Sequence, residues 1–151
     1  MQLKPDNLGF NTEDEVKLFD FGLAKELSSR DRDANGLYRN MTGFTGAIRY
    51  MAPEVGKKQR YNLGADVYSW TMLLWHIMAL EPPLGLYTPD MMIDRVFNKG
   101  HRPVINEKWP EQIQNLLRFG WCEDITKRPT MPQILEAIDG VMQELEQNER
   151  S

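Results

Sequence analysis

The chain has 151 residues, of which 41% are hydrophobic and 26% charged, a composition that predicts one ordinary globular domain and excludes a collagen-like or disordered chain. Lysine and arginine total 18 against 22 aspartate and glutamate residues, and the net charge of −4 argues against a nucleic-acid partner. The single cysteine, Cys122, excludes an internal disulfide, so we expect a reducing, cytoplasmic compartment.

The predicted elements begin with a short β-hairpin over residues 8–19, in which Val16 and Leu18 alternate with Lys17 as in a half-buried strand. Residues 25–45 show no sustained periodicity, so we expect a long loop. The stretch 65–80 is apolar but carries Asp66 and is too short for a membrane span. It predicts a helix buried on nearly all sides, and no membrane partner.

Helical patterns follow to the end of the chain. Thr88 and Pro89 predict the start of a helix that Gly100 ends. A second helix is expected around residues 113–121, and a third is expected to begin with a capping box of Thr130 and Gln133. Its predicted buried face is Ile134, Leu135, Ile138, Val141, Met142 and Leu145. The predicted fold is therefore mainly α, with helices around a buried central helix and one small hairpin.

The chemistry lies at the two ends of the hairpin. Asn7 precedes the first strand and Asp20 follows the second, so the hairpin returns the chain to its starting level. An amide oxygen and a carboxylate that converge there suit Mg²⁺, with substrate phosphates completing the coordination. Lys4 could offer a positive charge to a phosphoryl group. Taken singly, each residue is equally typical of a polar turn or a strand end.

Five motifs then occur in one order: LKPDN, DFGLAK, YMAPEV, DVYSW and KRPTM. Together they resemble the large C-terminal lobe of a eukaryotic protein kinase, whose fold is α+β and mainly helical, and the resemblance runs from about residue 3 to about residue 146. The resemblance implies phosphoryl transfer from ATP with Mg²⁺ and a protein substrate. By the same resemblance, Lys4 contacts the transferring phosphate, Asn7 and Asp20 hold Mg²⁺, and Gly22 allows the turn after Asp20.

The resemblance also implies structural roles. Glu54, in the motif that closes the activation segment, is expected to form a buried ion pair with Arg128. Asp66 is expected to brace the catalytic loop, although it could simply complement the dipole at a helix start. A lysine at the position of Lys4 in the first motif is typical of serine/threonine kinases. The run 46–54 is similar to the corresponding segment of the tyrosine-kinase-like branch, whose members are mostly serine/threonine kinases. The activation segment, residues 20–54, carries the candidate phosphorylation sites Ser28, Ser29, Tyr38, Thr42 and Thr45.

Four departures from the family pattern limit the expected activity. Gln2 stands where the family has its catalytic aspartate, and an amide cannot accept a proton as a carboxylate does. Ala47 replaces a hydroxyl residue, and Gly9 lies in the strand whose side chains usually support the adenine ring. The 151 residues contain neither a glycine-rich loop nor a strand lysine of the small lobe.

We therefore expect residues 1–151 to be one partial kinase domain, a C-lobe from a truncated chain or incomplete gene, inactive or nearly so alone. ATP would bind once a small lobe is supplied. The missing lobe should leave an exposed apolar face near Leu8, Phe10 and Phe21. The alternative is a non-catalytic, pseudokinase-like module that docks a partner kinase or substrate through this face and the region 88–105.

Overall fold

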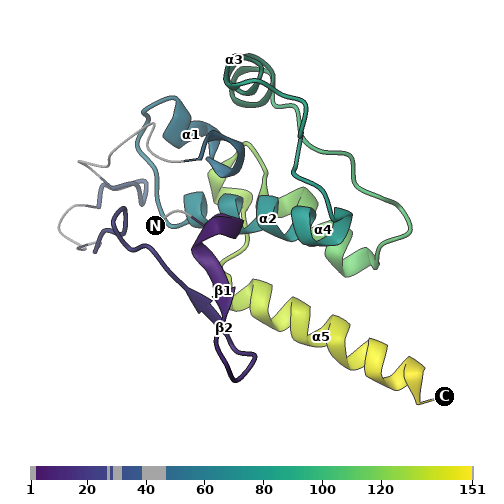
Figure 1. Ribbon diagram of the computed structural model, residues 1–151. Helices are drawn as coiled ribbons and strands as arrows, with labels where there is room; N and C mark the ends of the chain where they lie inside the picture. Colours follow the sequence, from purple (N-terminus) through teal and green to yellow (C-terminus); the bar gives the residue numbers. More distant parts are fainter. Residues whose placement is uncertain (1–2, 27, 29–31, 39–46, 151) are drawn as a thin grey trace.

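The computed structural model describes residues 3–26, 28, 32–38 and 47–150, and it is mainly helical, with one small antiparallel sheet (Figure 1). Helix α2 lies at the centre, with α4 beside it, and α5 projects away toward the C-terminus. The predicted fold class is confirmed. In chain order the elements are η1 (Pro5–Asn7), β1 (Leu8–Phe10), β2 (Val16–Leu18), η3 (Ile48–Tyr50), α1 (Pro53–Gly56), α2 (Gly64–Ala79), α3 (Pro89–Met91), η4 (Met92–Asn98), α4 (Glu111–Gly120), η5 (Ile125–Lys127) and α5 (Met131–Glu149).

The hairpin of β1 and β2 forms where the sequence predicts it. Its antiparallel register pairs Leu8 with Leu18, Gly9 with Lys17 and Phe10 with Val16. Asn11 closes the turn, since its side-chain oxygen accepts the backbone N–H groups of Glu13 and Glu15. The predicted half-burial of the second strand is wrong for Val16, which is exposed. A two-stranded sheet has no packed face of its own, so only the Leu8–Leu18 end is partly covered.

Helix α2 is the centre of the main hydrophobic core. Within it only Ile77 is exposed, as predicted for a helix surrounded by the rest of the chain. Its interior hydroxyls are satisfied within the helix, because Thr71 donates to the Val67 carbonyl at 2.8 Å and Ser69 to that of Ala65 at 3.2 Å. Across the described residues, no helix has the length and apolar character needed to cross a lipid bilayer.

Helix α4 packs against α2 at very short range. It forms where the sequence predicts a helix, its buried face is Ile113, Leu116 and Leu117, and it ends at Gly120. A Cβ atom on Gly120 would overlap the Thr71 hydroxyl of α2. Glycine is therefore required there by the approach of the two helices and not by its backbone angles.

The segment after Thr88 differs in detail from the prediction. Thr88 caps it by accepting the Met91 N–H, and Gly100 ends it with a φ of +69°. Residues 92–98, however, form a π-helix instead of an α-helix. Because i→i+5 hydrogen bonds widen the turn, Met92, Val96 and Phe97 all reach one buried cluster, while Ile93 remains partly exposed.

Helix α5 begins with the predicted capping box, in which Thr130 and Gln133 bond reciprocally. Its predicted buried face is wrong in extent. Only Ile134 and Val141 are buried, whereas Leu135, Met142 and Leu145 are exposed. The physical reason is that α4 covers a single stripe of α5, and the later turns extend beyond the body of the molecule (Figure 1).

Two glycine-to-alanine substitutions test the packing of these helices. Gly120→Ala should lower the free energy of unfolding by about 1–3 kcal/mol, because the added methyl group overpacks the contact with Thr71. Gly140→Ala in α5 is the matched control, since no atom lies within 4 Å of the added group. It should raise stability by about 0.5–1 kcal/mol through helix propensity. Urea unfolding measures both, and equal effects of the two changes would contradict the proposed close approach.

Candidate functional site

One backbone hydrogen bond joins Asn7 to the residue before Asp20, the other predicted metal ligand. Asn7 ends η1 and is buried, with 5% of its surface exposed. The backbone N–H of Phe19 donates to the Asn7 carbonyl at 2.8 Å and extends the hairpin ladder by one position. Asp20 is the next residue, so the hairpin returns the chain to its starting level as predicted. That the two side-chain oxygens share one ion remains a prediction.

Asp20 has an unusual backbone for a non-glycine residue. Its φ of 57° lies in the left-handed region, which costs an ordinary L-residue about 1–2 kcal/mol. The exposed side chain folds back, and its Oδ1 accepts the Gly22 N–H at 3.2 Å. Strain of this kind persists where the surrounding structure imposes it and occurs often at functional sites.

Gly22 was predicted to allow a turn by its backbone freedom, but the structure gives a different reason for glycine. Its φ is not positive. A Cβ atom at this position would lie 3.2 Å from Oδ1 of Asp20, a contact tighter than most side chains make. Gly22 therefore leaves room for the Asp20 carboxylate beside its own backbone.

Lys4 stands at the start of η1, with its ammonium 3.7 Å from an Asp6 carboxylate oxygen. Asp6 is exposed, so this ion pair is weak, and a phosphate of higher charge could displace it. Gln2, the residue at the position of the family's base, lies outside the described residues, as do Ser29, Thr42 and Thr45.

The donor set fits Mg²⁺ better than a transition metal. Asn7 and Asp20 provide an amide and a carboxylate oxygen, which are hard ligands. In the part of the chain that the structure describes, no three histidine, cysteine, aspartate or glutamate side chains gather into a metal cluster. Mg²⁺ commonly binds through one or two carboxylates, water and substrate phosphates, so a sparse protein donor set is what this ion requires.

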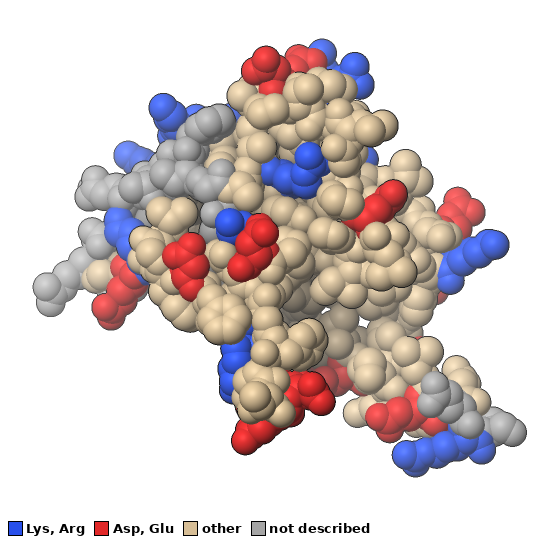
Figure 2. Space-filling view, in the orientation of Figure 1, with Lys and Arg blue, Asp and Glu red and all other residues tan. Residues whose placement is uncertain are grey.

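Exposed aromatic side chains surround these polar residues. Phe10 is 72% exposed and Phe21 59%, as expected for the apolar face of the hairpin. Phe19 and Leu23 are also about half exposed. Figure 2 shows mostly uncharged atoms along the hairpin, with acidic side chains at its tip. The exposure predicted for Phe10 and Phe21 is therefore confirmed, whereas the prediction is wrong for Leu8, which is partly buried at its pairing with Leu18.

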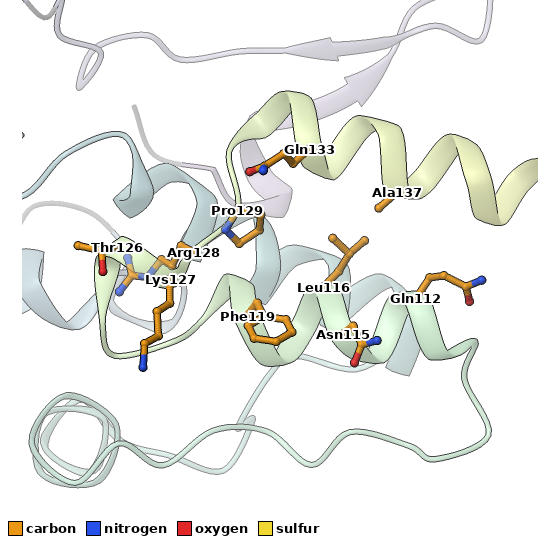
Figure 3. Close-up of a pocket in the computed structure, with 10 residues that line it drawn as sticks. All are labelled: Gln112, Asn115, Leu116, Phe119, Thr126, Lys127, Arg128, Pro129, Gln133 and Ala137. Atoms are coloured by element: carbon orange, nitrogen blue, oxygen red, sulfur yellow. The ribbon is translucent and has the colours of Figure 1, made fainter.

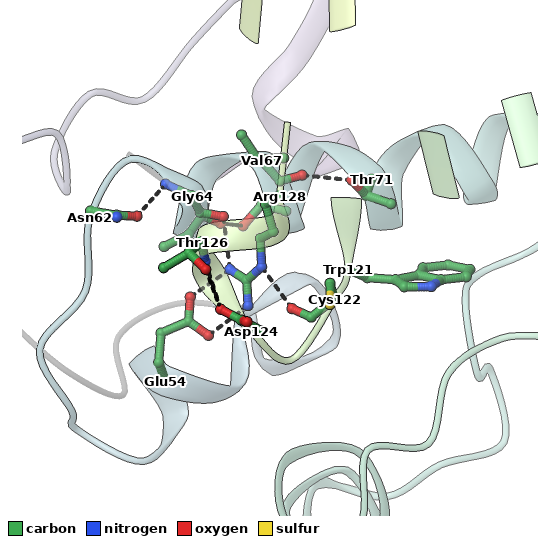
Figure 4. A network of polar contacts seen from close by, with 12 residues as sticks. Glu54, Asn62, Gly64, Val67, Thr71, Trp121, Cys122, Asp124, Thr126 and Arg128 are labelled. Atoms are coloured by element: carbon green, nitrogen blue, oxygen red, sulfur yellow. Dashed lines mark hydrogen bonds and ion pairs between the residues drawn. The ribbon is translucent and has the colours of Figure 1, made fainter. Parts of the chain in front are cut away.

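Arg128 and Glu54 form the predicted ion pair deep in the structure (Figure 4). The two guanidinium amino groups meet the two carboxylate oxygens at 2.6 and 2.9 Å, with side-chain exposures of 0% and 11%. Arg128 also donates to the backbone carbonyls of Gly64 at 2.8 Å and Cys122 at 2.9 Å. It thereby links α1, the start of α2 and the turn after α4.

Tyr68 of α2 lies close to two arginines. The guanidinium carbons of Arg102 and Arg128 each lie 5.2 Å from the centre of its ring. The side chain is fully buried, burial raises the pKa of its phenol, and its hydroxyl has no hydrogen-bond partner among the described residues. These contacts were not predicted, because Arg102 belongs to no motif and only tertiary packing brings it to Tyr68.

Asp66 is the third residue of α2, and burial raises the pKa of its carboxyl. A position in the first turn fits both interpretations, the brace of the catalytic loop and the helix-start acid. Its bracing role therefore stays a prediction.

The described part of the activation segment contains a β-bridge and a turn, although the sequence predicts only a loop there. Residues 32 and 38 form an antiparallel bridge, and the Tyr38 N–H donates to the Tyr61 carbonyl at 3.0 Å. Asp33 accepts the N–H groups of Asn35 and Leu37 and pairs with Arg60 at 3.2 Å. The backbone hydrogen bond to Leu37 is the main reason why the pKa of the Asp33 carboxyl is low. The Asp-x-Asn-Gly sequence was the available signal for this turn.

Arg49 is a second residue that sequence reasoning missed. Its guanidinium donates to the Pro83 carbonyl at 2.7 Å and to the adjacent Leu84 carbonyl. These contacts fasten the end of the activation segment to the loop between α2 and α3. No sequence pattern predicts that Arg49 donates to backbone carbonyls so far along the chain.

A groove of about 560 Å³ lies between α4 and α5, away from the hairpin (Figure 3). Leu116, Phe119 and Pro129 give it apolar walls, and Gln112, Asn115 and Gln133 line it with amides. Of the predicted site residues it contains only Arg128, whose charged group is already paired. The groove therefore does not contribute to the polar site at the hairpin.

Comparison with known proteins agrees with this geometry. The family model described as "Protein tyrosine and serine/threonine kinase" matches residues 2–138. The chain is 35% identical over 95% of its length to the serine/threonine-protein kinase VIK of Arabidopsis thaliana. It is 33% identical over 91% of its length to the serine/threonine/tyrosine-protein kinase HT1 of the same plant. The dual specificity protein kinase shkB of Dictyostelium discoideum is 32% identical over 89% of the chain.

The helical fold, the polar hairpin at its edge and the order of the motifs together are those of a protein kinase lobe. The chain belongs to the protein kinase family. It spans about a third of the length of the kinases VIK and HT1 and a fifth of that of shkB. The family generally uses ATP and Mg²⁺.

The ion pair yields a stability prediction. Arg128→Ala should lower the free energy of unfolding by about 3–5 kcal/mol, because it leaves the Glu54 carboxylate buried without its partner. Lys127→Ala is the matched control. Its exposed ammonium lies 3.9 Å from Asp124, a pair worth at most about 1 kcal/mol. Urea unfolding followed by tryptophan fluorescence gives both values, and similar losses would show that the Arg128 network is not structurally important.

Tyr68 yields a pH prediction. A phenol whose folded pKa is raised contributes stability that is intact below the unfolded pKa of about 10 and is lost as the pH rises above it. Tyr68→Phe should therefore reduce the alkaline loss of stability. At neutral pH it should raise the free energy of unfolding by about 1 kcal/mol, since it removes an unpaired buried hydroxyl.

The control for this measurement is Tyr87→Phe, which deletes a hydroxyl bonded to His101 at 2.7 Å and should bring no gain. Unfolding curves between neutral and alkaline pH make the comparison. A Tyr68→Phe protein that is less stable than the original at neutral pH would contradict the assignment of an unpaired hydroxyl.

Proposed function

We propose that this chain is the large-lobe part of a protein kinase that transfers the γ-phosphoryl group of ATP to serine or threonine hydroxyls of protein substrates. The observation that carries the proposal is the hydrogen bond between Phe19 and Asn7, which returns the chain so that Asp20 follows beside Asn7. The serine/threonine specificity rests on Lys4 in the first motif and on the names of the relatives. Residues 1–151 would form one partial kinase domain.

In this proposal each site residue has one task. Asn7 and Asp20 hold Mg²⁺, which neutralises charge on the phosphates and orients them when it is bound. Lys4 leaves its weak pair with Asp6 and contacts the transferring phosphoryl group. Gly22 keeps the Asp20 carboxylate close to the backbone, where its backbone N–H fixes the carboxylate's orientation. None of these groups needs to lose or gain a proton.

Proton transfer is the weak step. The family's catalytic aspartate accepts the proton of the substrate hydroxyl, and Gln2 occupies that position in the sequence. Loss of a general base reduces the rate by about 10²–10⁴-fold. The exposed aromatic face of the hairpin agrees with a cleft that needs a second lobe to cover the nucleotide.

Metal binding tests the site directly. Mn²⁺ in place of Mg²⁺ should broaden the backbone NMR signals of Asn7 and Asp20 before those of the rest of the chain. Asn7→Ala and Asp20→Asn should each weaken the Mn²⁺ affinity measured from this broadening by at least about tenfold, because each change removes one metal ligand. Glu13→Gln, which removes an acid from the exposed tip of the same hairpin, is the control and should change nothing.

Uniform weak broadening over all acidic residues, unchanged in the two site variants, would refute the assignment of Asn7 and Asp20 as metal ligands.

Activity gives an independent test. With Mg·ATP and a generic basic protein, the chain alone should turn over well below about 1 s⁻¹, the lower end of the kinase range. The physical reasons are the amide at position 2 and the exposed aromatic side chains of the hairpin. Incorporation of radiolabelled phosphate measures the rate. Turnover within the normal kinase range would show that neither feature limits catalysis.

A further inference from the structure

The groove between α4 and α5 has the size and the surface of a binding site. Its volume of about 560 Å³ lies within the range of about 300–1,000 Å³ that is usual for ligand pockets. Leu116, Phe119 and Pro129 give it an apolar surface, and Phe119 is 54% exposed although it is a large aromatic residue. Among the described residues, none of the hairpin lines the groove, so its ligand need not touch the proposed metal ligands.

Both walls of the groove carry side-chain amides that are already held in place (Figure 3). Asn115 of α4 accepts from the Arg118 guanidinium at 3.1 Å, and Gln133 of α5 accepts from the Thr130 N–H at 2.8 Å. Guanidinium and backbone N–H groups only donate, so each of these amides must accept through its oxygen. The NH₂ groups of Asn115 and Gln133 make no hydrogen bond within the described part of the chain and are available to a ligand.

Gln112 is oriented in the opposite sense. Its NH₂ group donates to both carboxylate oxygens of Glu144 at 2.9 Å, and a carboxylate only accepts. The side-chain oxygen of Gln112 is therefore the atom left for a ligand. The groove thus offers two amide donors and one amide acceptor beside an apolar surface. Because all three amides are oriented before a ligand binds, less side-chain freedom is lost on binding.

The charge of the groove favours an acidic ligand. Lys127 and Arg128 line it, and no aspartate or glutamate does so among the described residues. Arg128 is already paired with Glu54, so Lys127 is the cation that remains. The Lys127 side chain is 67% exposed, and its ammonium lies 3.9 Å from Asp124, a long and weak contact. Asp124 also accepts the N–H and hydroxyl of Thr126, so it stays hydrogen-bonded if Lys127 turns to a ligand.

An extended peptide segment suits these groups better than a helix or a small acid. A strand has free N–H and C=O groups along both edges, whereas a helix bonds its own groups internally. Amides on both walls can therefore bond to the backbone of a strand, while its alternate side chains cover the apolar surface. A small carboxylate could use the two donors and Lys127, but it has no N–H for the oxygen of Gln112.

We propose that this groove is a docking site for an extended segment of a partner protein, with apolar residues at alternate positions and an acidic residue at the Lys127 end. Backbone carbonyls of the segment accept from Asn115 and Gln133, and a backbone N–H donates to Gln112. A carboxylate pairs with Lys127, and the apolar side chains cover Phe119. The inference does not rest on the proposed function, since the site involves neither ATP nor metal.

Selection from random heptapeptides displayed on phage tests the proposal. The immobilised 151-residue chain should enrich peptides that combine acidic residues with apolar residues at alternate positions. Lys127→Glu should reverse the charge preference from acidic to basic, because it reverses the exposed charge of the groove. Lys99→Glu is the matched control. Lys99 is 66% exposed and also adjoins an aspartate, but it does not line the groove, so the preference should stay acidic.

The affinity of one enriched peptide, synthesised with blocked ends, gives a second arm. In fluorescence anisotropy titrations, Phe119→Ala should weaken binding about tenfold, because it removes the exposed aromatic contact. Asn115→Leu keeps the size of the side chain but removes the NH₂ donor, and it should weaken binding about threefold to tenfold. Phe10→Ala removes an exposed ring from the hairpin and should leave the affinity unchanged.

Several results would overturn the proposal. One is the absence of any enriched peptide, and another is a peptide preference that Lys127→Glu leaves unchanged. Enriched peptides with apolar residues three and four positions apart would indicate a helix in the groove. Phenylacetate that binds as tightly as the best peptide would indicate a site for small acids. Dimerisation of the chain that Phe119→Ala abolishes would indicate a second copy as the occupant.

Discussion

The buried guanidinium of Arg128 is the interaction on which the rest of this lobe depends. A charge with no exposed surface is tolerated only if its donors are satisfied, and Arg128 meets this requirement with a carboxylate and two backbone carbonyls. Its partners come from α1, the start of α2 and the turn after α4. The elements must therefore take one mutual arrangement, because any other would leave the charge or Glu54 buried and unpaired.

The hairpin that carries the proposed site has a different physical basis. It has only three residues in each strand, and most of its apolar side chains face outward. Its geometry comes from backbone pairing and from the Asn11 turn and not from a packed core. Segments with few buried contacts open more readily than the core. A site built on such a hairpin is positioned by hydrogen bonds, and its rigidity would increase when a second lobe and a nucleotide cover it.

This division between core and hairpin suits a phosphotransfer enzyme. The chemistry requires oriented phosphates and an ion more than it requires a reactive side chain. The family thus needs a stable helical body and a small set of oxygen and ammonium groups at its edge. This chain has the helical body, and Lys4, Asn7 and Asp20 are the ammonium and oxygen groups of the proposed site, whereas Gln2 stands at the position of the general base.

Sequence by itself determined the hairpin and the central helix, which are encoded locally in hydrophobic period and in turn and cap residues such as Thr130. The order of the motifs determined the family, and the pairing of Glu54 with Arg128 followed only from the resemblance that these motifs carry. Tertiary structure alone decided the π-helical turn at 92–98, the exposure of Leu135, the clamp made by Arg49 and the amide-lined groove between α4 and α5. Each of these depends on which distant surface meets the residue, and a linear pattern of polarity carries no information about that partner.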